Sequence, residues 1–136
     1  MAHRVLLAAP HDVILDVQPA LAKCLELSAA ETLDEAITRL HADKPEMLLV
    51  CYAFDNVRPF RLLQYLQLEW QGPKMPIMLI RAVPVSTGKA EEAEIFEAYS
   101  SLGVLHFFNL WNQIAQHGRE VALRRLQHAV QSILPT

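Results

Sequence analysis

The stretch Lys44–Leu63, KPEMLLVCYAFDNVRPFRLL, contains a predicted buried strand, the loop that follows it and the start of a helix. Met47 to Val50 form an uninterrupted apolar run, which is typical of a strand covered on both faces within a parallel sheet. In open sheets of this kind, sites lie just beyond the carboxyl ends of the strands. Cys51 occupies that position, and Asp55 follows in the loop. We therefore expect this unit to decide both the fold and the place of any site.

The composition indicates one globular domain covering residues 1–136. Hydrophobic residues make up 52% of the chain and charged residues 20%, enough apolar material for a sizeable core. The formal net charge is -3, and Lys and Arg are scattered until the C-terminal segment, so we do not expect nucleic acid as a ligand. No apolar run approaches the roughly 20 residues that span a bilayer, and no signal-peptide pattern opens the chain. We expect a cytoplasmic protein that does not associate with membranes.

Two cysteines, Cys24 and Cys51, form neither a CxxC motif nor a cluster with histidines. Such a pair does not make a disulfide framework or a metal motif. We expect reduced thiols and no cofactor.

Apolar runs and amphipathic stretches alternate along the rest of the chain. Besides the central run, the predicted strands are Arg4–Ala9, Leu25–Ala30, Met75–Val83 and Val104–Phe108. Helical spacing predicts a helix after each strand, and the final one covers Val121–Leu134. This alternation implies a five-stranded parallel sheet with helices on both faces.

Local signals place several helix ends. Thr32 with Glu35 forms a capping box that opens the second helix, while Pro59 suits the first turn of the third, which we expect to stop at Gly72. Pro19 removes a backbone donor, so we expect the first helix to start late or to be kinked. An acidic surface helix is expected over 90–102, ended by Gly103. Residues 110–118 form either a loop or an extra helical turn.

The chain resembles the receiver domain of bacterial response regulators over nearly its whole length. KPEMLLVCYAF is similar to the third strand of that family, which normally begins Lys-Pro-Asp and ends in the phosphoacceptor aspartate. Arg81 and Ala82 stand where the family has Thr or Ser followed by Ala, and 103–108 resembles its Gly-Ala-Asp-Asp-Tyr-Leu passage. The resemblance implies an α/β, three-layer flavodoxin-like (CheY-like) fold, doubly wound, with strand order 2-1-3-4-5. It also implies a role in two-component signal transduction.

The resemblance also shows a degenerate active site. It places Cys51 at the phosphoacceptor position, Ala9 and Pro10 at the acidic pair, Arg81 at the Thr/Ser position and Leu110 (or Asn109, in a shifted register) at the lysine. A thiol is a poor ligand for Mg²⁺, and Ala and Pro side chains are not ligands. Metal-assisted phosphoryl transfer would lack its nucleophile and its clamp. We therefore expect a pseudo-receiver that is not an enzyme.

Polar loop residues at the same edge of the sheet leave two interpretations open. His11, Asp12 and Asp55, with Arg81, would form a mixed-charge pocket for a small polar ligand. Alternatively, the two acids have turn or helix-cap roles and the imidazole is solvated, which is the commoner role of such loop residues. The loop over 83–89 is longer than is usual in the family and would reshape the pocket mouth.

Cys51 likewise has two interpretations. A neighbouring cation such as Arg81 would lower its pKa and make a redox or nucleophilic thiol. The simpler interpretation, which we favour, is a small buried side chain that fills the place of the missing aspartate.

Aromatic residues supply a candidate partner-binding surface: Phe96, Tyr99, Phe107 and Trp111. Aromatic anchors dominate the energetics of many interfaces. Helical and strand spacing favours the core for Phe96 and Phe107, whereas Trp111 lies among polar residues and suits an interface. The leading hypothesis is a stand-alone, phosphorylation-independent module that binds another protein of unknown identity, with a homodimer through the last two helices as one form. The alternative is a small-molecule or redox sensor at the pocket around Cys51.

Overall fold

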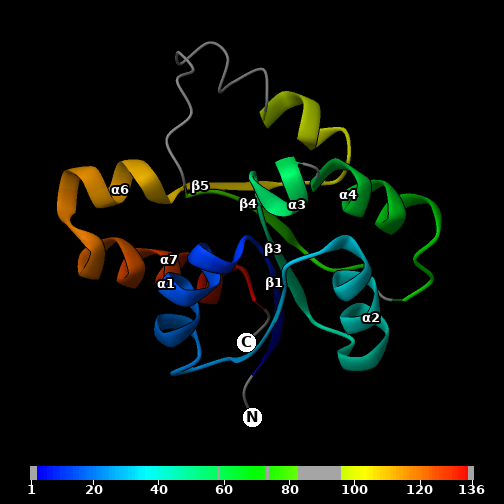
Figure 1. The fold of residues 1–136 in the computed structure, drawn as a ribbon, viewed down its shortest axis with the longest axis horizontal. Helices are drawn as coiled ribbons and strands as arrows, with labels where there is room; N and C mark the ends of the chain where they lie inside the picture. The colour runs from blue at the N-terminus through cyan, green and yellow to red at the C-terminus, as the bar shows by residue number, and fades with distance from the viewer. Residues whose placement is uncertain (1–2, 58, 73, 83–95, 135–136) are drawn as a thin grey trace.

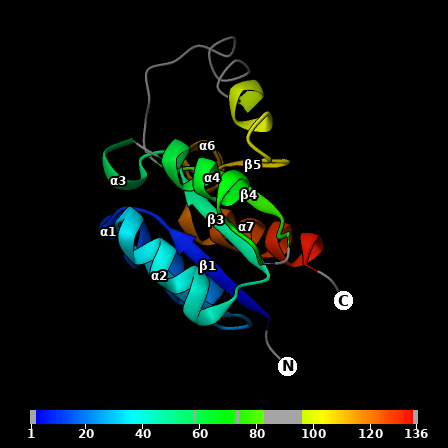
Figure 2. The same ribbon diagram turned by 90° about the vertical axis from the view of Figure 1, so that its right-hand side faces the viewer.

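Five parallel strands form one sheet in a computed structural model that describes residues 3–57, 59–72, 74–82 and 96–134. The order β2-β1-β3-β4-β5 confirms the predicted topology. Figure 2 shows β1 and β3 running side by side in the same direction. The strands lie within two residues of their predicted bounds: β1 Arg4–Ala8, β2 Glu26–Ala30, β3 Met47–Cys51, β4 Ile77–Arg81 and β5 His106–Asn109.

Helices cover both faces of the sheet, which completes the predicted three-layer arrangement. One side carries α1 and α7, and the other carries α2 and α4 (Figure 1). The helices are α1 His11–Leu21, α2 Leu33–Asp43, α3 Phe54–Val57, α4 Pro59–Leu68, α6 Leu110–His117 and α7 Arg119–Ile133. Residues 96–100 are also helical, whereas residues 90–95 of the predicted acidic helix and the 83–89 loop lie outside the described residues.

The central strand supplies both layers of the core. Met47, Leu49 and Cys51 belong to the apolar cluster beneath α1 and α7. Leu48 and Val50 belong to the cluster beneath α2 and α4. All five side chains are fully buried, as an uninterrupted apolar run in a parallel sheet predicts.

Three helix ends confirm or correct the local predictions. The Thr32 hydroxyl oxygen accepts a hydrogen bond from the Glu35 N–H at 3.2 Å, so the predicted cap at the start of α2 is confirmed. The late start predicted for α1 is wrong, because the helix begins at His11, shortly after β1 ends at Ala8. Pro19 lies in its last turn, where the missing donor costs only one intrahelical hydrogen bond. The end predicted for α4 at Gly72 is also wrong, since that helix ends at Leu68.

The C-terminal part contains one helix more than the minimal alternation requires. Gly103 adopts a φ of 95°, and its turn follows helical residues 96–100, as predicted. After β5, the stretch that was open between loop and helix forms α6, whose first turn is capped by the Asn109 side chain on the Asn112 N–H at 2.9 Å. Gly118, with a φ of 85°, then connects α6 to α7.

Within the described part of the chain, no helix combines the length and the hydropathy that crossing a bilayer would require.

Candidate functional site

Cys51 ends β3 at the carboxyl edge of the sheet, and its side chain has no solvent exposure. Its neighbour across the ladder is Ile80 of β4. Burial raises the pKa of the Cys51 thiol, and hydrogen bonds from the backbone of Ala53 and Ala82 offset this only in part. The thiol is therefore protonated at neutral pH, in contrast to the activated thiolate that redox or nucleophilic chemistry needs.

Apolar groups surround this thiol. Ala9, at the end of β1, is fully buried, and Leu110, at the start of α6, is 2% exposed. Both belong to the same core cluster as Cys51, and the half-buried Ala53 and Ala82 pack against that cluster. The Cys51 thiol is thus packed among methyl and isobutyl groups.

Pro10 and Arg81 complete the neighbourhood that the resemblance indicated. Pro10 precedes α1 with an extended backbone and supplies no side-chain cap to that helix. Arg81 ends β4, opposite Asn109 of β5, and is half-buried. These two positions offer a ring and a cation where an oxygen-rich metal site would need acceptors.

The two loop acids, Asp55 and Asp12, have different roles. Asp55 accepts a hydrogen bond from the Leu33 N–H at 3.0 Å, which makes it a cap for α2. Asp12 is exposed in the first turn of α1, where a negative charge is favoured by the helix dipole. Among the described residues, no three His, Cys, Asp or Glu side chains lie close enough to hold a metal ion together.

His11 is exposed, and its Nδ1 lies 3.4 Å from the Glu31 carboxylate, which follows β2. This contact turns the imidazole toward the neighbouring loop. Its surroundings match a solvated loop histidine better than a member of a shared pocket.

The four aromatic candidates divide into a packed group and one exposed residue. The rings of Phe96 and Phe107 meet edge to face at 5.9 Å, and Tyr99 meets Tyr52 in the same way at 6.3 Å. All three candidates are half-buried against the α2–α4 core cluster. Burial, followed by the nearby Tyr52, raises the pKa of Tyr99. Trp111, in the first turn of α6, is 43% exposed.

Two features were missed by sequence reasoning. The hydrogen bond by which Asp55 caps α2 joins residues 22 positions apart, so no local sequence pattern predicts it. The second is a groove between α1 and α7, whose lining comes from opposite ends of the chain.

The five-stranded parallel sheet and its strand order match the CheY-like flavodoxin fold, and solved receiver domains align with the chain over almost their full length. A response regulator of Thermotoga maritima has a TM-score of 0.69 at 17% identity, covering 98% of each chain. The phosphorylated cyanobacterial phytochrome response regulator RcpA has a TM-score of 0.70 at 16% identity, covering 100% of each chain. The chemotaxis response regulator CheY4 of Vibrio cholerae has a TM-score of 0.67 at 14% identity, covering 94% of this chain and 98% of its own.

These identities are low, so the likeness is one of fold. No protein-family model and no curated protein sequence matches the chain.

Proposed function

We propose that this chain is a receiver-like signalling module that acts without phosphorylation, by binding a protein partner. The observation that carries the proposal is the fully buried Cys51 thiol at the end of the central strand. The receiver resemblance assigns that position to the phosphoacceptor. A buried neutral thiol offers no carboxylate oxygen for an acyl-phosphate bond.

The neighbouring residues do not fit the Mg²⁺ that phosphoryl transfer in receivers uses. This ion prefers near-octahedral oxygen ligands. Ala9 and Pro10 supply no side-chain oxygen, and the Asp55 carboxylate is engaged at the start of α2. The side chains at these positions therefore do not fit a Mg²⁺ site.

Thiol-based sensing is the weaker alternative. Redox-sensing cysteines are accessible and have a lowered pKa. Cys51 is inaccessible, and burial raises its pKa. The small-ligand alternative needs His11, Asp55 and Arg81 to converge, yet His11 contacts Glu31 and Asp55 contacts Leu33.

Binding through an exposed aromatic is the mode that the surface supports best. The Trp111 side chain is large and 43% exposed, and it lies in the first turn of α6, directly after β5. Phe96, Tyr99 and Phe107 remain candidates for the edge of this interface, with their rings already packed within the chain. A rigid, preorganised aromatic loses little conformational entropy on binding.

Beryllofluoride with Mg²⁺ tests the proposal, because this pair mimics a phosphorylated aspartate only where an aspartate and a metal site exist. Fluorescence of the two tryptophans reports a structural response. We expect no saturable, Mg²⁺-dependent change, while a receiver with an intact aspartate responds under the same conditions. A saturable response in this chain would overturn the proposal.

A further inference from the structure

Helices α1 and α7 run parallel and in register along one face of the molecule. An ion pair joins Asp16 to Arg119 at 3.1 Å, and a hydrogen bond runs from the Gln127 amide to the Cys24 sulfur at 2.9 Å. Both pairs join residues 103 positions apart. Eight residues further along one helix therefore meet the residue eight further along the other. Only parallel neighbours keep such a constant offset.

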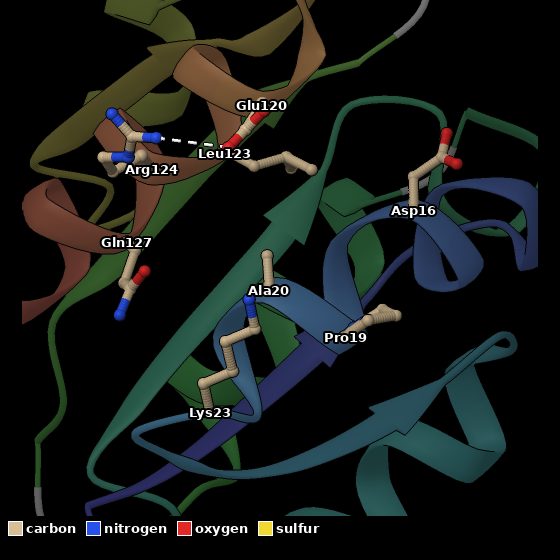
Figure 3. Close-up of a pocket in the computed structure, with 8 residues that line it drawn as sticks. All are labelled: Asp16, Pro19, Ala20, Lys23, Glu120, Leu123, Arg124 and Gln127. Atoms are coloured by element: carbon tan, nitrogen blue, oxygen red, sulfur yellow. Dashed lines mark hydrogen bonds and ion pairs between the residues drawn. The ribbon is translucent and has the colours of Figure 1, made fainter.

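A groove of about 320 Å³ lies between the two helices (Figure 3). Its apolar lining comes from Pro19 and Ala20 of α1 and from Leu123 of α7. Leu15, one turn before Pro19 on α1, is 59% exposed, so it extends the apolar surface on that helix. Apolar residues flanked by charged ones are the pattern of a protein interface.

The charged residues of the groove are sorted by sign along its length. Asp16 and Glu120 come first along the groove, whereas Lys23 follows the carboxyl end of α1 and Arg124 lies one turn after Glu120 on α7. Asp16 and Lys23 are seven residues apart, which corresponds to roughly 10 Å of helix rise. Opposite charges are thus separated by about two helical turns on α1 and by one turn on α7.

The ion pairs between the described residues leave one positive charge of the groove without a counter-charge. Asp16 is compensated by Arg119, and Arg124 reaches Glu120 at 3.4 Å in an exposed i,i+4 pair. Within the described residues, the exposed Lys23 ammonium has no acidic partner at ion-pair distance. A cation without a counter-charge beside an apolar groove points to an acid supplied from outside the chain.

We propose that the α1–α7 groove is a homodimer interface whose occupant is the same groove of a second copy. A two-fold axis lying across the helices sets the two copies antiparallel, so the acidic end of each groove covers the basic end of the other. Lys23 then faces the partner's Asp16, and Arg124 faces the partner's Glu120. Such self-complementarity is the requirement of an isologous interface.

This inference goes beyond the proposed function, because it assigns a partner and a surface that do not depend on Cys51 or Trp111. It also differs from a dimer built from the last two helices, since α1 contributes half of the surface. A small ligand is the less suitable occupant, as it would have to carry opposite charges two helical turns apart.

Light scattering across micromolar to millimolar concentrations tests the interface. The expected molar mass rises to twice the 15.4 kDa of the chain and falls again at high salt, which screens the charge pairs at the rim. A mass that stays at 15.4 kDa over the whole range overturns the proposal.

Charge reversal then tests the surface. Lys23→Glu places a negative charge opposite the partner's Asp16, and Asp16→Lys places a positive charge opposite the partner's Lys23. We expect each variant alone to dimerise more weakly, on the order of tenfold, and an equimolar mixture of the two to recover association. Arg61→Glu is the matched control, an equal charge change at an exposed position of α4 on the other face of the sheet.

A second variant, Ala20→Arg, fills the groove without changing the sign of its basic end. It should also abolish dimerisation, while its circular dichroism remains that of the wild type. A dimer that persists in both Lys23→Glu and Ala20→Arg, or a mixture that fails to recover, rejects the groove as the interface. These outcomes are independent of any phosphorylation assay, so failure here leaves the proposed function untouched, and the reverse also holds.

Discussion

The Asp55 carboxylate accepts a hydrogen bond from the Leu33 N–H at 3.0 Å, and this contact ties the loop after the central strand to the start of α2. Asp55 adopts a φ of 46°, a left-handed conformation that Asp and Asn tolerate better than most residues. Thr32 caps the same helix through the Glu35 N–H. Two of the first N–H groups of α2 are therefore satisfied by side chains from different parts of the chain.

Asp55→Ala should lower the free energy of unfolding by about 1–3 kcal/mol, because it removes a cap and strains a residue with positive φ. Asp55→Asn keeps an acceptor oxygen and the backbone tolerance, so its change should stay within about 0.5 kcal/mol. Urea denaturation of the two variants separates these expectations. Equal stability of both would show that the contact contributes nothing.

The buried Cys51 predicts a fall in stability at alkaline pH. Its pKa is raised in the folded state above the ordinary value of 9.0, so the unfolded chain releases this proton first as pH rises. The stabilising effect of the neutral thiol is thus fully present below the pKa that Cys51 has in the unfolded chain. It is lost as the pH rises toward the pKa that Cys51 has in the folded protein. Urea titrations from neutral pH upward should show a steeper loss for the wild type than for Cys51→Ala. Parallel curves would contradict the burial argument.

Leu110 occupies the place that the receiver resemblance assigns to a lysine, and it is 2% exposed. Leu110→Ala should cost about 2–5 kcal/mol of unfolding free energy, since it leaves a cavity among packed side chains. Leu105→Ala is the control, because that leucine is 71% exposed and should change stability by less than about 0.5 kcal/mol. Thermal and urea unfolding measure both. A small effect at Leu110 would mean that the edge of the sheet is open to solvent.

Trp111→Ala should leave the fold intact and remove partner binding. The ring is 43% exposed, so its loss costs the core little, whereas aromatic anchors carry much of the binding energy of interfaces. Affinity capture from the native host with wild-type and variant protein, followed by mass spectrometry, compares the retained proteins. Leu68→Ala is the control, as that leucine is 81% exposed at the end of α4. Equal capture by the wild type and Trp111→Ala would remove Trp111 from the interface.

The fold was predictable because the spacing of the apolar residues agrees with the turn and cap residues that separate the helices and strands. The run Met47–Val50 has no polar interruption, and a strand buried on both faces needs that pattern. Helix ends were harder to predict, since they depend on contacts between distant residues. Helix α4 ends at Leu68, ahead of Gly72, and the Trp70 ring lies against the position that a Cβ at Gly72 would occupy. No periodicity in the sequence encodes that packing.

The position of Cys51 at the end of the central strand was predictable, and the surroundings of its side chain were less so. The sequence placed Cys51 at the edge of the sheet, but whether its thiol is activated depends on burial, and the structure shows none of it exposed. The hydrogen bond between Asp55 and Leu33 and the constant offset between α1 and α7 arise from the tertiary structure. Such contacts join residues that a single sequence gives no reason to pair.

Incubation with acetyl phosphate and Mg²⁺, followed by intact-mass measurement, tests the absence of a phosphoacceptor most directly. A receiver with an intact aspartate is treated in parallel and must gain a phosphoryl group. The present account predicts an unchanged mass for this chain at every time point. A stoichiometric, Mg²⁺-dependent gain of one phosphoryl group would contradict it.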